Sequence, residues 1–151
     1  LLRFQKWQFS LGAVSAVFHD VLIVLDIFSL TYKIMPFNME INQAFIAALL
    51  TVIGYSLNDT VVVFDRIREF FRIHKSWDNE TTVNTALNST LSRTLNTSLT
   101  TLIVLIAIFI FGGESIRGFM FALIIGVMVG TYSSVFIATP IMFDSYKKKV
   151  S

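Results

Sequence analysis

Five ionisable side chains lie within otherwise apolar stretches of this 151-residue chain, and they are the residues best suited to do chemistry: His19, Asp20, Asp26, Asp59 and Arg93. An ionisable group inside a membrane costs several kcal/mol unless it is paired or hydrated, so each is a functional candidate. A carboxyl group in such a place can exchange a proton when its surroundings change. The set therefore makes proton exchange a candidate function, beside a purely structural role.

Asp59 and Arg93 are expected at similar depth on consecutive antiparallel helices. Asp59 lies about six residues before the expected exit of its helix near 65–66, or roughly 9 Å. Arg93 lies six or seven residues after the expected entry of the next helix near 86–87, roughly 10 Å deep. Because an unpaired Arg would be costly there, we predict that the two charges pair. The pair is either static and fixes helix packing, or it lets Asp59 exchange a proton.

Polar residues around these charges predict a hydrated pocket. Ser56, Asn58 and Thr60 flank Asp59. A polar stripe on the following helix either lines a water path or bonds to neighbouring helices: Thr90, Arg93, Thr97, Thr100 and Thr101.

His19 and Asp20 come near the middle of the first apolar stretch. Adjacent positions on a helix do not face each other, so we expect a separate partner for each. Asp20 is a candidate third member of the Asp59–Arg93 network. Asp26 is expected nearer the outer surface.

Four apolar stretches must position these residues, and each exceeds the approximately 20 helical residues that cross a bilayer. They are expected at about 9–32, 43–64, 86–111 and 119–143. Hydrophobic residues make up 54% of the chain and charged ones only 15%, against about 25% in an ordinary domain. We therefore predict an all-α, polytopic bundle of transmembrane helices, forming a single domain over 1–151.

Lys and Arg residues set the expected orientation. Nine lie in the two ends and the 66–84 loop, and two, Lys33 and Arg117, lie in the other connections. Both ends and the 66–84 loop are thus predicted to be cytoplasmic. Asp78 or Asn79 is expected to begin the third helix, Gly112-Gly113 to end it, and Ser115 to cap the fourth.

The fourth stretch carries small residues every four positions, and Pro140 is expected to bend its last turn. The small residues are Gly118, Ala122, Gly126, Gly130, Ser134 and Ala138. Such a row lets another helix approach closely, so Gly126, Gly130 and Ser134 are predicted packing positions.

Several classes of function find no support. A net charge of +2 is too small to indicate nucleic-acid binding, and zero Cys excludes thiolate chemistry. No zinc, nucleophile-elbow or phosphate-loop motif is present, so we predict neither an enzyme nor a resident cofactor.

The 52–69 segment, VIGYSLNDTVVVFDRIRE, resembles the signature of the SecF family of protein-export membrane subunits. The resemblance extends to FHDVL at 18–22, LSRT at 91–94, FGG at 111–113 and IGVMVGTYSS at 125–134. The SecF half of a fused SecDF chain fits equally. The resemblance implies the resistance-nodulation-division superfamily, whose SecF members have six transmembrane helices and a periplasmic domain between the first two. By that measure the chain holds helices three to six.

The resemblance also implies a function in the bacterial inner membrane. There SecD and SecF, with YajC as an associated protein, assist the SecYEG channel in moving unfolded chains across the lipid bilayer, driven by a proton or sodium flow. The family's functional Asp and Arg match Asp59 and Arg93. Two alternatives stay open: a structural scaffold of the translocon with a static ion pair, and a small-molecule or lipid exporter of the same superfamily.

Overall fold

The chain forms an all-helical bundle in a computed structural model that describes residues 7–34 and 42–150, with side chains described through Ser145. Four long helices carry most of it: α1 (Trp7–Thr31), α2 (Gln43–Ile73), α3 (Asn79–Phe111) and α4 (Glu114–Ser133). A short π-helix, η1 (Ser134–Ala138), continues α4 into α5 (Thr139–Val150).

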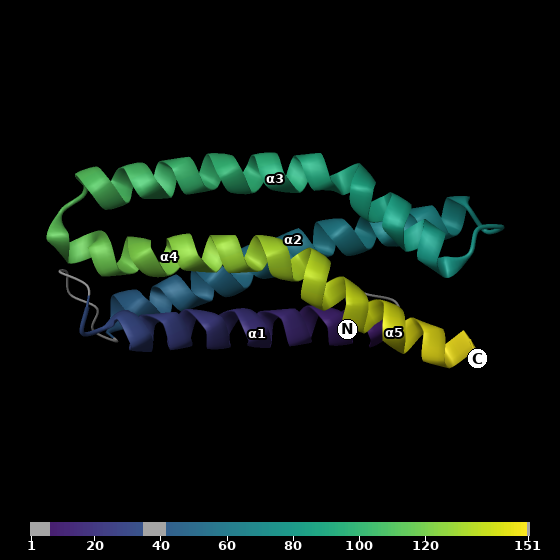
Figure 1. Ribbon diagram of the computed structural model, residues 1–151, viewed down its shortest axis with the longest axis horizontal. Helices are drawn as coiled ribbons and strands as arrows, with labels where there is room; N and C mark the ends of the chain where they lie inside the picture. Colours follow the sequence, from purple (N-terminus) through teal and green to yellow (C-terminus); the bar gives the residue numbers. More distant parts are fainter. Residues whose placement is uncertain (1–6, 35–41, 151) are drawn as a thin grey trace.

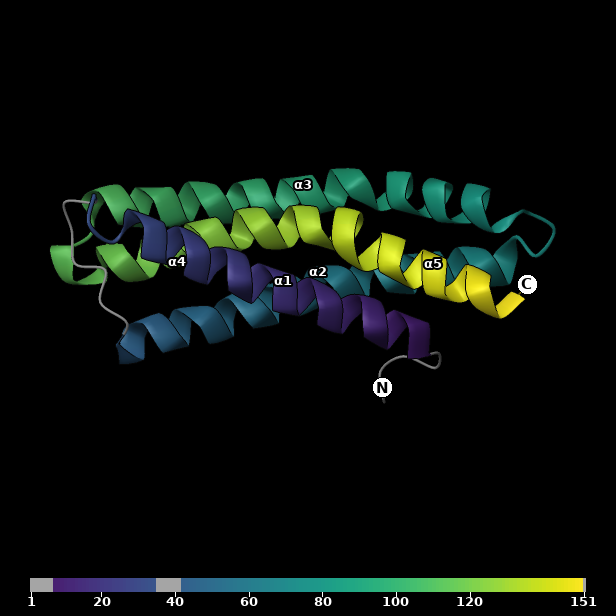
Figure 2. The ribbon, with the colours of Figure 1, turned by 60° about the horizontal axis from the view of Figure 1, so that its bottom comes forward.

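Long helices that follow one another in the chain run antiparallel along the long axis of the bundle (Figures 1 and 2), so α2 and α4 run parallel. The turn between α2 and α3 and the end of α5 lie at one end, and the turn between α3 and α4 lies at the other. Four helical segments are long and apolar enough to cross a membrane, with α4, η1 and most of α5 forming the fourth. The predicted all-α architecture is confirmed.

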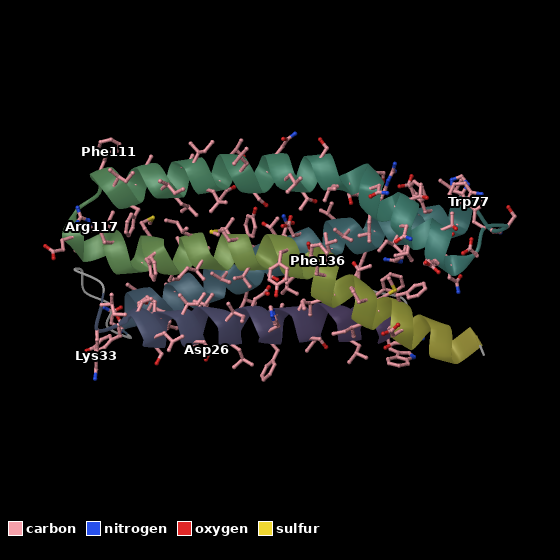
Figure 3. All side chains as sticks on the ribbon, viewed as in Figure 1. Asp26, Lys33, Trp77, Phe111, Arg117 and Phe136 are labelled. Atoms are coloured by element: carbon pink, nitrogen blue, oxygen red, sulfur yellow. The ribbon has the colours of Figure 1, made fainter. Side chains whose placement is uncertain are left out.

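The helices are longer than their predicted spans. At 31 residues, α2 is roughly 46 Å long, against an apolar bilayer core of about 30 Å, so it extends beyond one membrane surface or both. The predicted 66–84 loop shrinks accordingly to a turn over 74–78. Trp77 lies at that end, and Lys33 and Arg117 lie at the opposite end (Figure 3).

Side-chain and glycine caps fix most helix ends. The Asp78 carboxylate accepts a hydrogen bond from the backbone N–H of Thr81, so Asp78 is the N-cap of α3. Gly112 ends α3, as predicted. The Ser115 prediction is wrong, because α4 already begins at Glu114 and its N-cap is Gly113, which has no side chain to cap with.

The row of small residues on the fourth span faces inward, as predicted. Gly126 lies against Val52 of α2 so closely that an added Cβ would overlap that side chain. On α1, Gly12 packs in the same way against the carbonyl oxygen of Ala138. Close backbone approach therefore joins α4 and η1 to both α1 and α2.

The fourth span bends at η1, before the proline that was expected to bend it (Figure 1). Pro140 has no N–H to bond to the carbonyl four residues earlier, and this favours a widened turn just before it. The Thr139 hydroxyl donates to the carbonyl of Ser134 at 2.9 Å, which partly compensates for the disrupted ladder.

Packing is uneven across the bundle. The two apolar core clusters draw mainly on α1, α2 and the fourth span, whereas most α3 side chains in the apolar half are exposed. Within 99–111 on α3, the exposed side chains are apolar apart from Thr100. Such a surface suits contact with lipid or with another apolar helix.

Candidate functional site

Asp20 is the most completely buried carboxyl group of the described residues, with 0% of its surface exposed. One of its oxygens, Oδ2, accepts hydrogen bonds from two hydroxyls: Ser56 on α2 and Ser133 on α4, the latter at 2.9 Å. Three helices thus meet at one carboxylate oxygen. A buried polar group held by several donors is a rigid feature of a core.

The other oxygen of Asp20, Oδ1, is connected toward the surface through two half-exposed rings, those of His19 and Tyr132. It lies 3.2 Å from Nδ1 of His19, and Nε2 of His19 lies 3.1 Å from the hydroxyl of Tyr132 on α4. The expectation that His19 and Asp20 do not contact each other is therefore wrong, although each also has the separate partner that was expected. The imidazole reaches sideways along the helix surface, so both of its nitrogens have partners.

Gly130 of α4 packs beside this cluster. An added Cβ would lie 3.5 Å from the Cβ of Ser56 and 3.8 Å from Oδ2 of Asp20, which are ordinary van der Waals distances. Gly130 is therefore buried against α2, as a packing position would be, but the close approach there does not require a glycine.

Asp59 has a different environment. It lies one turn beyond Ser56 on α2 and is 7% exposed, and its Oδ2 has no hydrogen-bond partner. Nearby, the buried hydroxyl of Thr60 is also without a partner. A buried carboxylate without donors pays its full desolvation cost, which protonation or an approaching cation would remove.

Arg93 does not make the direct ion pair that equal depth predicted. Among the described residues no Arg93–Asp59 nitrogen–oxygen contact lies within 4.0 Å, although Arg93 is near enough to attract Asp59 electrostatically. Thr90 and Thr94 turn toward the bundle, so Arg93, about 100° away on the helix, is exposed. The depth of a residue in the membrane does not determine which face of its helix it occupies, so depth could not predict that Arg93 is exposed.

Most of the remaining predicted residues lie on exposed helix faces, and one is buried. Asn58 and Thr97 are exposed and stand away from the buried cluster, and Asp26 is exposed as well, pointing away from α1 in Figure 3. Ser134 is buried and donates to the carbonyl of Thr131 at 3.0 Å.

A second chain of hydroxyls joins α2, α3 and α4, and the sequence analysis missed it. The hydroxyl of Tyr55 lies 3.1 Å from that of Ser98, which lies 2.6 Å from that of Thr131. Tyr55 immediately precedes Ser56, and Thr131 lies two residues before Ser133. The adjacent hydroxyls at 131–134 of the fourth span are the sequence signal that could have indicated both contacts.

No cluster of three or more metal-ligating His, Asp or Glu side chains occurs in 7–34 or 42–145. The arrangement instead offers two buried carboxyl groups on adjacent helices. One is held by donors and the other is not.

Known proteins resemble this chain over nearly its whole length. Residues 1–148 match the family model described as "Protein export membrane protein SecD/SecF, C-terminal". The protein translocase subunit SecF of Rhodothermus marinus is 60% identical over 144 residues, which are 95% of this chain and 46% of that protein. The protein of the same name from Cereibacter sphaeroides is 50% identical over 141 residues, 93% of this chain and 41% of that protein.

A solved structure has the same fold. A crystal structure of SecDF in a super-membrane-facing form superposes with a TM-score of 0.86 at 40% identity, covering 95% of this chain and 19% of that one. The chain thus spans less than half the length of the SecF relatives it matches.

Proposed function

This chain belongs to the SecD/SecF family of protein-export membrane proteins, and we propose that it forms the ion-coupled membrane part of a SecF subunit that assists protein translocation. The family is one of transport proteins, not of enzymes, and this chain is a multi-pass membrane protein. In the proposal, Asp59 carries the ion, Arg93 is its charge partner, and Asp20 is a relay.

The observation that carries the proposal is the unpartnered Asp59 oxygen near an exposed candidate partner. Asp59 is buried at mid-helix and lacks a donor on Oδ2, while Arg93 is exposed on the least packed helix. A small rotation or shift of α3 would bring the guanidinium to the carboxylate. The carboxyl group would release its proton as Arg93 arrives and bind one as it leaves.

Motion of this kind is the physical requirement for coupling. A two-state helix arrangement is biased by protonation only if the two states differ in their interactions with the charged group. The α2–α3 interface supplies that difference at Asp59. The α1–α2–α4 cluster around Asp20 holds its geometry through two hydroxyl donors and provides the fixed frame.

The partners proposed follow from the family. A SecDF structure shares the fold, so SecD, as a separate subunit or as the other half of one chain, is the proposed neighbour. The complex would act with the SecYEG channel and YajC on an unfolded chain, in the bacterial inner membrane. The coupling ion is proposed to be the proton, with sodium as the alternative.

The test is export driven by the proton-motive force, using the full-length SecF with SecD and SecYEG in proteoliposomes. Asp59→Asn keeps the shape but cannot ionise, and we expect it to abolish the part of export that the ion gradient drives while the complex still assembles. Asp26→Asn removes an exposed acid of the same type and serves as the matched control.

Two outcomes would count against the proposal. If Asp59→Asn prevents assembly without a specific loss of ion coupling, Asp59 is part of a scaffold. If a charge swap, Asp59→Arg with Arg93→Asp, fully restores export, the pair is static and structural.

A further inference from the structure

A groove runs between α3 and the bent end of the fourth span. It consists of two adjoining cavities of about 370 and 480 Å³. Both are lined by Asn84, Leu87 and Val135, which form their shared boundary. The sequence predicts polar residues along α3 but no cavity.

The groove leads from one end of the bundle to its middle. Its outer part is lined by Glu80 in the first turn of α3 and by Asp144 on α5, and its inner part by Leu95 and Tyr132. From Glu80 to Leu95 is roughly 22 Å along the helix, and Leu95 lies about 13 Å beyond the expected membrane entry near 86–87, close to the middle of a bilayer core of about 30 Å. The end with the two carboxylates is the one predicted to be cytoplasmic.

The lining combines charged, polar and apolar side chains, and Leu87, Leu91 and Leu95 alternate with the polar ones along α3. Two carboxylates at the mouth raise the local concentration of cations, including protons. Side chains that can hydrogen-bond water follow inward along one wall, and they are Asn84, Asn88 and Thr94. Water needs several polar partners to occupy a cavity, and this wall supplies them.

The inner end of the groove meets the chain of contacts to Asp20. Tyr132 lines the groove and lies 3.1 Å from Nε2 of His19, whose Nδ1 lies 3.2 Å from Asp20. We infer that the groove is a cytoplasmic water path for protons, and that Tyr132 and His19 connect it to the buried Asp20. This inference rests on the proposed ion coupling and adds the route by which a proton reaches the site.

The transfer along this chain balances one proton. A hydronium ion in the groove gives a proton to the Tyr132 hydroxyl as that hydroxyl gives its own to Nε2 of His19, and the hydronium ion becomes water. His19 then releases the proton on Nδ1 to Oδ1 of Asp20, which becomes a carboxylic acid. His19 is left with its proton on Nε2, and the reverse transfer restores it. Only O–H and N–H bonds change.

The first test asks whether the groove is hydrated from the cytoplasmic side. This chain has no Cys, so single cysteines can be introduced without background from it. In the full-length protein with its SecD partner, Asn88→Cys and Val135→Cys should react with a charged, membrane-impermeant thiol reagent added on the cytoplasmic side. Val14→Cys is the matched control, because Val14 is 66% exposed on the outer face of α1, away from the groove.

The second test asks whether protons pass through the hydroxyl of Tyr132. Tyr132→Phe keeps the ring contact with His19, which has centroids 5.7 Å apart, but removes the hydroxyl. We expect proton flux through the reconstituted full-length complex to fall about a hundredfold, the lower range for a positioned proton donor. Phe136→Leu, which changes the ring next to Tyr132, should leave the flux near its original value.

The outcomes separate this inference from the proposed function. Equal labelling of the groove and control cysteines, or full proton flux in Tyr132→Phe, would overturn the groove path. If either occurs while Asp59→Asn still abolishes flux, ion coupling stands and only its route is wrong. If Asp59→Asn leaves the flux intact, the proposed function fails whatever the labelling shows.

Discussion

The two buried carboxyl groups among the described residues lie about one helical turn apart in depth, but they differ in how completely they are enclosed and hydrogen-bonded. Asp20 is fully enclosed where α1, α2 and α4 meet, and each of its oxygens has a partner. Asp59 lies at the α2–α3 interface, where Oδ2 has none and the nearest cation is exposed. An aspartate can therefore fix one helix interface, as Asp20 does between α1, α2 and α4, while another aspartate leaves the α2–α3 interface free to change.

The region where α1, α2 and α4 meet is also packed more tightly than the region around α3. Small residues let α4 approach α1 and α2 closely, while α3 leaves most of its apolar half uncovered. A protein that must convert ion binding into movement needs both a rigid frame and an element that shifts. The predictions below test whether the α1–α2–α4 region is that frame and α3 the moving element.

The largest effect on stability is expected where the frame is tightest. Gly126→Ala places a methyl group against Val52, and overpacking of this kind costs about 1–3 kcal/mol. Gly54→Ala is the control, since an added Cβ there meets nothing within 4 Å, and it should be neutral or stabilise by up to about 1 kcal/mol. Thermal unfolding of the full-length protein in detergent gives both values. Equal effects of the two would contradict a tight frame.

The next effect compares the two carboxyl groups directly. Asp20→Ala strips Ser56 and Ser133 of their acceptor and should destabilise the protein by about 1–3 kcal/mol. Asp59→Ala should cost clearly less, because its Oδ2 makes no hydrogen bond that could be lost. Denaturation of both variants under one condition decides the ranking. A larger loss for Asp59→Ala would reverse the roles assigned to the two sites.

Movement of α3 can be blocked at one point. The hydroxyls of Ser98 and Thr131 lie 2.6 Å apart, close enough for a cysteine pair at these positions to form a disulfide. Oxidation of the double variant should stop ion-driven export by tying α3 to α4, and reductant should restore it. The single variants, treated identically, control for loss of the hydroxyls. Undiminished export in the oxidised protein would show that α3 need not move there.

The smallest effect concerns the start of α3, outside the membrane. Hydrogen bonds from Thr81 hold the pKa of Asp78 below its usual range. A lowered pKa in the folded state means that the cap contributes stability above the ordinary pKa of 3.8 and loses it as the pH falls below that value. The protection of the Thr81 and Thr82 amides from exchange, relative to the intrinsic exchange rate at each pH, should therefore fall as the pH drops below 3.8. Asp78→Asn retains an acceptor and should flatten that dependence, and an unchanged pH profile would refute the cap.

The sequence predicted where the helices lie better than it predicted which face of each helix points into the bundle. Apolar length located all four helices, and Asp78, Gly112 and the small-residue row were identified because caps and close packing have local signals. Whether Arg93 or its neighbour Thr94 faces the bundle depends on how α3 packs, which no local pattern determines. The contacts of Ser133 and Tyr132 with α1 depend likewise on how α4 packs against α1.

Ion current through the reconstituted full-length complex tests the central claim most directly. Current would be recorded for the original protein, Asp59→Asn and Asp26→Asn, at several pH values and with sodium replaced. If Asp59 carries the ion, Asp59→Asn removes the current under all conditions and Asp26→Asn leaves it unchanged. A current in Asp59→Asn equal to the original, with the same ion dependence, would contradict that role for Asp59.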